Sequence, residues 1–438
     1  MIKDQRDKIL YKNTILNYGW KTVYYIFSFL AVPLVLNFLG KERFGIFQTI
    51  LTFISWAMLA NLGIGNGLRN KISEYIGSNK SNELKGIIGS AFSASLSISI
   101  ILLLTGLIFF GFIFDPLWLF SNVTISSNEI RLTFLISFVF FCFNLFFSLF
   151  SSIAYGIHKS YIVTIAQVFQ YGLYCLFLFF LIKAGAISSL IFVSIVYGVS
   201  MILSQLIPIF IISKKSELWP PDFKKRKNYY KELLSMSIGF FVLQLSSIVL
   251  FSSDNFILSK LLGPDDVAEY SIANKIFFLI INVFSIILIQ VWNSTTDAMA
   301  RKDYEWIKRT VKRLNKILIL VFIGSIFIAL ILNPLIKLWV GQSFNFSLTF
   351  RLSFAIYVLI HCINAIYVNI LNGLGKLTLQ TISYIITAIL NFIISYLLII
   401  KMNIGVSGVL YSKIICVVIT TTICIYDYKR FFKSIENI

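Results

Sequence analysis

Long apolar runs separated by short polar connections make up most of the chain. A helix that crosses the roughly 30 Å hydrocarbon core of a bilayer needs about 20 mainly apolar residues, and about twelve runs meet this requirement. They are centred near residues 26, 54, 100, 142, 171, 199, 248, 281, 327, 361, 387 and 415. Within them, polar and apolar residues do not alternate with the period of two that a membrane barrel requires. The pattern predicts an all-α integral membrane protein with about twelve transmembrane helices.

Composition supports this class. Of the 438 residues, 58% are hydrophobic and only 13% are charged, and the mean hydropathy is +0.85. Ordinary soluble domains have about 25% charged residues. The apolar runs also recur so densely that no stretch is left for a soluble domain. Five cysteines all fall inside apolar runs without paired CxxC spacing, and we expect them to be small buried hydrophobic residues rather than disulfide or metal ligands.

The net charge of +19 does not indicate a nucleic-acid partner, because Lys and Arg form short clusters between apolar runs. Most of the 38 Lys and Arg residues fall in connections on one side of the predicted bundle, which the positive-inside rule assigns to the cytoplasm. Both termini are then cytoplasmic, and the polar start MIKDQRDKILYKN leads into a retained helix rather than a cleaved signal peptide. Two basic connections, residues 213–232 and 297–316, are expected to lie on anionic lipid headgroups.

The chain contains an internal repeat. LVLNFLGKERFGIF (34–47) aligns with FILSKLLGPDDVAEY (256–270) at a displacement of 223 residues, which places Gly40 on Gly263 and Phe47 on Tyr270. Because each half has an even number of crossings, both halves enter the membrane from the same side and form parallel repeats, an arrangement typical of transporters.

The repeat continues through the second part of each half. RLTFLIS (131–137) matches RLSFAIY (351–357), and AYGIHKS (154–160) overlies LNGLGKL (371–377) with Gly156 on Gly373. The sequence therefore predicts an N-terminal lobe at residues 1–212, a basic cytoplasmic linker at 213–232 and a C-terminal lobe at 233–438.

Three lysines lie inside predicted helices, where a charge costs about 2.5 to 3.5 kcal/mol on insertion scales. Lys413 is too deep to reach the headgroups comfortably, and we interpret it as a contact for an anion in a central lumen. Lys21 and Lys275 are nearer to the interfaces, so each could line the lumen or extend its ammonium to the headgroups.

Asp254 and His361 are further candidates in the membrane region. Asp254 could form a structural pair with Lys275 or Lys260, or it could bind a coupling proton or sodium ion. His361 could hydrogen-bond within the bundle or relay protons.

The segments LGKERFGIFQTI, ANLGIGNGLRNKISE and LLGPDDVAEYSIANKI resemble bacterial O-antigen flippases. These proteins belong to the multidrug/oligosaccharidyl-lipid/polysaccharide exporter superfamily. The resemblance implies two six-helix lobes in a V shape around a central cationic lumen. Many relatives carry an Asp where this chain has Asn61, so a carboxylate role cannot be transferred to that position.

The cargo that the resemblance implies is an oligosaccharide on undecaprenyl pyrophosphate, moved across the bacterial cytoplasmic (inner) membrane. Polysaccharide polymerase and chain-length machinery would be further partners. Arg69, at the cytoplasmic mouth, could hold the pyrophosphate through bidentate charge-assisted bonds. Alternatively, Arg69 is an ordinary cation at a helix end.

No catalytic constellation, nucleotide-binding loop or cofactor motif is present in the sequence, so a non-enzymatic transporter is expected. Two alternatives remain. A membrane glycan polymerase or ligase would also have many helices but typically has a larger outer loop. A drug/cation antiporter of the same superfamily would need acidic residues in the first six helices, where this chain has none.

Overall fold

The computed structural model divides the chain into two compact units, residues 1–119 with 123–244 and residues 245–438 with 120–122. The structure describes residues 5–57, 63–77, 81–120, 123–157, 159–215, 218–223, 229, 245, 250–300, 302–376 and 378–436.

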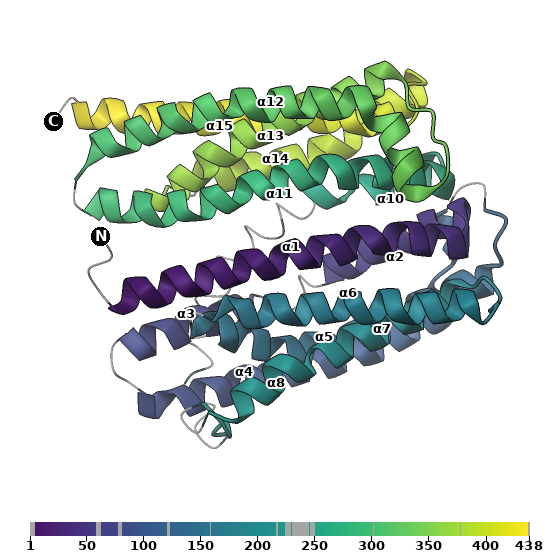
Figure 1. Ribbon diagram of the computed structural model, residues 1–438, viewed down its shortest axis with the longest axis horizontal. Helices are drawn as coiled ribbons and strands as arrows, with labels where there is room; N and C mark the ends of the chain where they lie inside the picture. The colour runs from purple at the N-terminus through teal and green to yellow at the C-terminus, as the bar shows by residue number, and fades with distance from the viewer. Residues whose placement is uncertain are drawn as a thin grey trace. The chain divides into compact units, whose positions relative to one another are not determined.

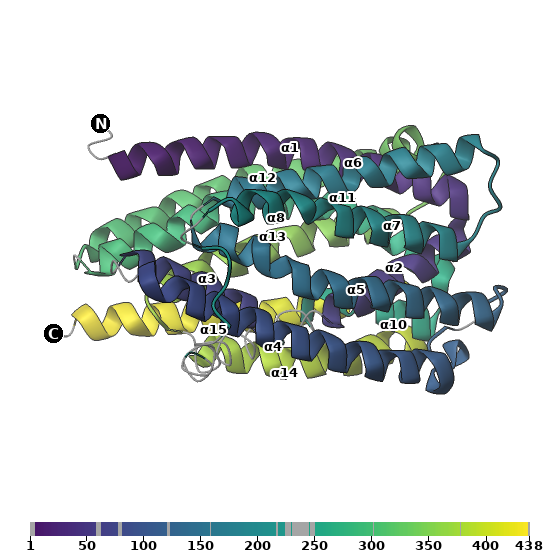
Figure 2. The ribbon, with the colours of Figure 1, turned by 90° about the horizontal axis from the view of Figure 1, so that it is seen from below.

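Unit 1 is built from helices joined by short connections, and Figure 1 shows these helices running beside one another. Its elements are α1 (Gln5–Leu39), α2 (Lys41–Ala57), α3 (Ile64–Gly77), α4 (Ser81–Ile108), the π-helix Phe109–Ile113, the 3₁₀ turn Pro116–Trp118, α5 (Ser127–Gly156), α6 (Ser160–Lys183), α7 (Leu190–Ser204) and α8 (Leu206–Ser213). Helix α6 packs on α1, while α3 and α4 pack on α5, as the second view shows (Figure 2).

Unit 2 repeats this arrangement. Its elements are α10 (Asp254–Leu261), α11 (Pro264–Ala300), α12 (Tyr304–Val340), α13 (Leu348–Gly373), α14 (Thr378–Tyr396), the π-helix Leu397–Lys401 and α15 (Ser407–Glu436). Helix α13 packs against α11, α12 and α15, just as α5 packs against α3, α4 and α7 in unit 1.

The described residues contain ten helical segments that are long and apolar enough to cross a membrane. The first of them, Leu16–Ala57, joins α1 and α2 and so includes two of the predicted centres. The predicted crossing centred near residue 248 lies outside the described residues. The prediction of an all-α membrane protein is confirmed, and the other predicted centres fall within these ten segments.

The internal repeat is visible in the backbone angles of two aligned glycines. Gly40, between α1 and α2, has a φ of 75°, and Gly263, between α10 and α11, has a φ of 135°. A positive φ strains any residue with a Cβ atom. The aligned side chains that follow, Phe47 and Tyr270, are 2% and 1% exposed. The two glycines thus form equivalent corners between consecutive helices.

A second pair of glycines marks equivalent helix contacts. A Cβ atom on Gly156 would lie 2.8 Å from the Cβ of Ile72, and one on Gly373 would lie 2.7 Å from the Cβ of Thr295. Ile72 and Thr295 are separated by the same 223 residues that align the two halves. The end of α5 therefore meets α3 as the end of α13 meets α11, and in both units the contact is too close for a side chain.

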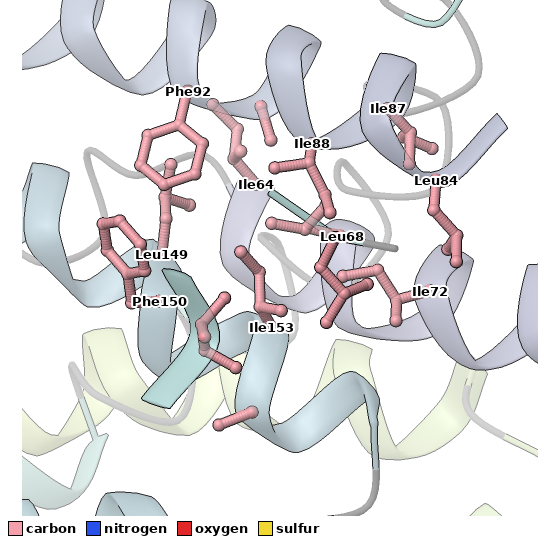
Figure 3. Close-up of a cluster of buried hydrophobic side chains, with 14 of the residues drawn as sticks. Ile64, Leu68, Ile72, Leu84, Ile87, Ile88, Phe92, Leu149, Phe150 and Ile153 are labelled. Carbon is pink, nitrogen blue, oxygen red and sulfur yellow. The ribbon is translucent and has the colours of Figure 1, made fainter. Parts of the chain in front are cut away.

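The segment around residue 64 forms a core helix. In Figure 3, Ile64, Leu68 and Ile72 of α3 point into a cluster with side chains of α4 and α5. These three residues recur every four positions and are all 0% exposed. Their spacing leaves the polar residues of α3 for its other faces, among them the exposed Arg69.

The basic segment after α8 begins by packing on unit 1. The Trp219 ring contacts the rings of Phe92 and Phe150 at centroid distances of 5.9 and 5.4 Å. The backbone N–H of Asp222 donates to the carbonyl oxygen of Lys85 on α4 at 2.8 Å. Most of the rest of the expected linker lies outside the described residues. The five cysteines are all buried, as predicted.

Candidate functional site

A break in a helix near the start of unit 2 positions the first candidate residue. Residues 250–252 are helical, Ser253 interrupts the helix, and α10 begins at Asp254. An interruption of this kind releases backbone carbonyl groups from their helical hydrogen bonds. The carbonyl of Phe251 is used in this way, because it accepts a hydrogen bond from Lys413 Nζ at 3.1 Å.

The Asp254 side chain is buried and has partners from two other helices. It is 4% exposed. Its Oδ2 accepts from the hydroxyl of Tyr270 on α11 and from Nζ of Lys413 on α15, both at 2.5 Å. Its Oδ1 is also buried but has no hydrogen-bond partner among the described residues. The carboxylate is therefore held firmly by one oxygen only.

Lys413 completes a buried ion pair. Its side chain is 3% exposed, that of Asp254 is 5% exposed, and the charged atoms are 2.5 Å apart. The ammonium also lies 5.1 Å from the ring centroid of Tyr357, a distance that permits a cation–π contact. The sequence predicted Lys413 as a lumen-facing anion contact, and it predicted that Asp254 pairs with Lys275 or Lys260 or binds a coupling ion. The structure pairs Asp254 with Lys413. The anion contact of Lys413 stays a prediction.

His361 lies beside this pair. Its Nδ1 is 3.4 Å from the hydroxyl of Tyr357, one turn earlier on α13. Its ring packs against that of Phe251 with centroids 5.1 Å apart. Tyr357 therefore contacts both Lys413, through its ring, and His361, through its hydroxyl. Proton relay by His361 stays a prediction.

Neutral polar residues extend the site toward α14. Asn391 Nδ2 donates to Ser253 Oγ at 3.2 Å, and Ser412 Oγ donates to Asn391 Oδ1 at 2.7 Å. These residues are 0% exposed. Ser253 and Ser412 directly precede Asp254 and Lys413 in the sequence. Asn391 thus links the serine next to one charged residue with the serine next to the other.

The other candidate cations lie on α11, α1 and α3. Lys275 is half-buried on α11 of unit 2. In unit 1, Lys21 is half-buried on α1, and the exposed Arg69 has its guanidinium 5.3 Å from the ring centroid of Tyr155. The structure thus brings together Asp254, Lys413 and His361.

Sequence reasoning missed the tyrosines of the site. Tyr270 and Tyr357 occupy apolar helices in a chain that has 21 tyrosines, so composition did not distinguish them. The repeat held a signal for one of them, because Tyr270 adds a hydroxyl where its aligned residue is Phe47.

Comparison with known proteins places the chain in a family. It matches the family described as "Polysaccharide biosynthesis protein" over residues 10–293, well over half of its length. Residues 239–397 match a second family, MatE.

Two curated relatives are similar along nearly the whole chain. The "Putative O-antigen transporter" of Salmonella typhimurium is 25% identical over 418 residues, which cover 89% of each chain. The "Putative O-antigen export protein" of Yersinia pseudotuberculosis is 24% identical over 419 residues, which cover 92% of each chain.

Solved structures show the fold. An inward-facing multidrug resistance MATE family transporter of the MOP superfamily has a TM-score of 0.75 at 14% identity and covers 97% of this chain and 99% of its own. A MOP superfamily transporter from Pyrococcus furiosus has a TM-score of 0.64 at 13% identity, with 96% and 95% covered. The repeated helical units therefore have the fold of MATE transporters, and the chain belongs to the polysaccharide biosynthesis protein family of membrane proteins.

Proposed function

We propose that the protein is a flippase for lipid-linked oligosaccharide, which moves an undecaprenyl-pyrophosphate-linked repeat unit of O-antigen or another surface polysaccharide from the cytoplasmic to the periplasmic leaflet. The match to the polysaccharide biosynthesis family carries this proposal. Relatives named for O-antigen transport, similar over about nine tenths of both chains, support the choice of cargo.

The proposed mechanism is alternating access by the two repeated units. The pyrophosphate enters a lumen open to the cytoplasm, the glycan is enclosed, and the lipid chain stays in the bilayer until movement of the units opens the lumen to the other side. In the proposal, the protein lies in the inner membrane with both termini in the cytoplasm. Polysaccharide polymerase and chain-length machinery then use the translocated unit.

Arg69 is the first candidate for the pyrophosphate. Its guanidinium is exposed, so it can take a ligand without giving up a buried partner. The planar guanidinium forms two parallel hydrogen bonds to a phosphate, whereas an ammonium acts as a point charge. Lys21 and Lys275 are proposed to supply further positive charge in the lumen. Lys413, the fourth cation predicted from the sequence, is paired with Asp254 in unit 2.

The test is translocation of a fluorescent undecaprenyl-pyrophosphate oligosaccharide in proteoliposomes, followed by quenching with a membrane-impermeant reductant. The wild type is expected to make the inner-leaflet probe accessible over time, whereas empty vesicles protect it. Arg69→Gln should slow the initial rate about tenfold, since a charge-assisted contact contributes about 1.5 to 3 kcal/mol. Arg69→Lys should give an intermediate rate. Arg430→Gln, which changes another exposed arginine, is the matched control and should leave the rate unchanged.

The same vesicles distinguish the alternatives. The MatE match and the multidrug transporters among the fold relatives make drug/cation antiport the second candidate. Exchange of a cationic dye for protons or sodium, without movement of the lipid probe, would favour antiport. Lengthened glycan products would favour a polymerase. Lipid movement without either would support the flippase.

A further inference from the structure

The strongest unassigned feature of the molecule is the oxygen-rich site around Lys413 Nζ in unit 2. The ammonium lies against Asp254 Oδ2 at 2.5 Å and the Phe251 carbonyl oxygen at 3.1 Å. Carboxylate and released backbone carbonyl oxygens beside a helix break are also the ligands that membrane transporters use for small cations. The ammonium therefore occupies a place where the ligand set suits a bound ion.

We propose that this is a monovalent cation site that the chain fills with its own Lys413 ammonium, so that a metal ion binds there only when Lys413 is removed. The ammonium brings the single positive charge that the carboxylate requires. This differs from the sequence-based hypothesis that Asp254 binds a coupling ion, because the tethered ammonium already holds that position. The proposal does not depend on the identity of the cargo.

The unpaired oxygen of Asp254 supports this interpretation. In a buried ion pair that serves only stability, the remaining lone pairs are expected to be satisfied by further hydrogen bonds. Here Oδ1 is buried and lacks a hydrogen-bond partner among the described residues, although Oδ2 receives two donors. An ion in place of the ammonium could bind both carboxylate oxygens together with the Phe251 carbonyl.

The surroundings also favour one positive charge. Around the ion pair, the polar and titratable groups of the site are Tyr270 from α11, Tyr357 and His361 from α13, and Asn391 from α14. Tyr357 presents its ring to the ammonium, and ring faces attract cations. Among the described residues that make these contacts, Asp254 supplies the negative charge and Lys413 the positive charge.

The first repeat shows that the fold itself does not require the pair. At the displacement of 223 residues, Ala31 is the counterpart of Asp254 and Phe47 is the counterpart of Tyr270. Both are buried, at 4% and 2% exposure. The same part of the repeat is therefore built from apolar residues in unit 1, which argues that the charges in unit 2 serve binding rather than packing.

The test measures thermal unfolding of the purified protein in nanodiscs, in sodium chloride and in choline chloride of equal concentration. The wild type should have the same midpoint in both salts, since its site is filled. Lys413→Met should unfold at a lower temperature in choline and recover by about 5 °C or more in sodium, because an ion that binds only the folded state stabilises it. The double variant Asp254→Asn/Lys413→Met also removes the carboxylate that would bind the ion, so its unfolding midpoint should be the same in both salts.

Lys401→Met, which removes an exposed lysine of unit 2, is the matched control and should behave as the wild type does. A wild-type unfolding midpoint that is higher in sodium chloride than in choline chloride would overturn the proposal, since the site would then accept a metal ion with Lys413 present. So would a Lys413→Met variant that is equally unstable, or equally impossible to purify, in both salts. Purification of that variant only in sodium would support the proposal.

Discussion

The two repeated units share their backbone contacts but differ in what they bury. Gly156 and Gly373 allow equivalent close approaches of helices, and Gly40 and Gly263 form equivalent corners. By contrast, Ala31 and Phe47 in unit 1 correspond to Asp254 and Tyr270 in unit 2. The fold therefore constrains the glycines in both copies, while one copy alone carries a buried ion pair at this place.

The difference extends to the last long helix of each unit. In unit 1, Tyr197 on α7 packs edge-on against Phe47 with ring centroids 6.0 Å apart. In unit 2, Lys413 on α15 reaches Asp254, which also accepts from Tyr270. Phe47 thus contacts another ring in unit 1, whereas Tyr270 in unit 2 shares the carboxylate of Asp254 with an ammonium. Because apolar replacements of buried ion pairs are often neutral or stabilising, the ionic version is more readily explained by function than by stability.

The largest expected loss of stability comes from replacing Asp254 by alanine, the residue at the aligned position 31 of the first repeat. Asp254→Ala leaves the Lys413 ammonium buried without its counter-ion, which should cost about 3 to 5 kcal/mol of unfolding free energy. The double variant Asp254→Ala/Lys413→Met removes both charges and should recover most of this loss. Thermal unfolding of the purified proteins measures both effects. Equal losses in the single and double variants would mean that the two charges are not coupled.

The glycine contacts should respond alike in the two units. Gly156→Ala and Gly373→Ala each place a methyl group within 2.8 Å of a neighbouring Cβ atom, and overpacking of this kind costs about 1 to 3 kcal/mol. Gly324→Ala is the matched control, because no atom lies within 4 Å of its Cβ position. That change within α12 should be neutral or stabilising by up to about 1 kcal/mol. A large loss at one contact glycine and none at the other would contradict the structural equivalence of the repeats.

The two corner glycines should be distinguishable by substitution with asparagine. Gly40, at a φ of 75°, is close to the left-handed helical region that asparagine tolerates, so Gly40→Asn should cost less than about 1 kcal/mol. Gly263, at 135°, is in a region used almost only by glycine, and Gly263→Asn should cost about 1 to 3 kcal/mol. The measurement is again the unfolding midpoint. A reversed order would show that neighbouring contacts, not φ, limit these positions.

Much of the fold could be predicted from the sequence because it rests on local patterns. Length and hydropathy identify the membrane helices, and pairs such as Gly156 and Gly373 reveal the duplication without coordinates. Their contact residues, Ile72 and Thr295, are also aligned by the repeat, so a helix contact in one unit predicts the equivalent contact in the other.

The site could be predicted only in part. The sequence identified Asp254, Lys413 and His361, because charged or titratable residues within an apolar helix are costly and mark functional sites. It did not identify their pairing, since Asp254 and Lys413 are 159 positions apart and two nearer lysines were available. Lys413 Nζ contacts both the Asp254 carboxylate and the Phe251 carbonyl, which lie on either side of the helix break at Ser253. Hydropathy does not reveal such a contact between distant helices.

The starts of α5 and α13 are capped in the same way. Ser126 Oγ accepts from the backbone N–H of Glu129 at 3.3 Å, and Ser347 Oγ accepts from that of Phe350 at 3.2 Å. Ser126→Ala and Ser347→Ala should each lower the unfolding free energy by about 1 kcal/mol, because a backbone donor loses its acceptor.

Ser148→Ala is the control for these caps, since the Ser148 hydroxyl donates to the carbonyl of Leu145 within α5 and caps no free N–H group. It should have little effect on the unfolding midpoint. Unequal losses at the two caps would point to Glu129, whose carboxylate also accepts from the Leu190 N–H at 2.9 Å and lies 3.5 Å from Arg43. In that case the entrance to α5 would be held by contacts between helices, and the two units would differ at this end as they do at the ion pair.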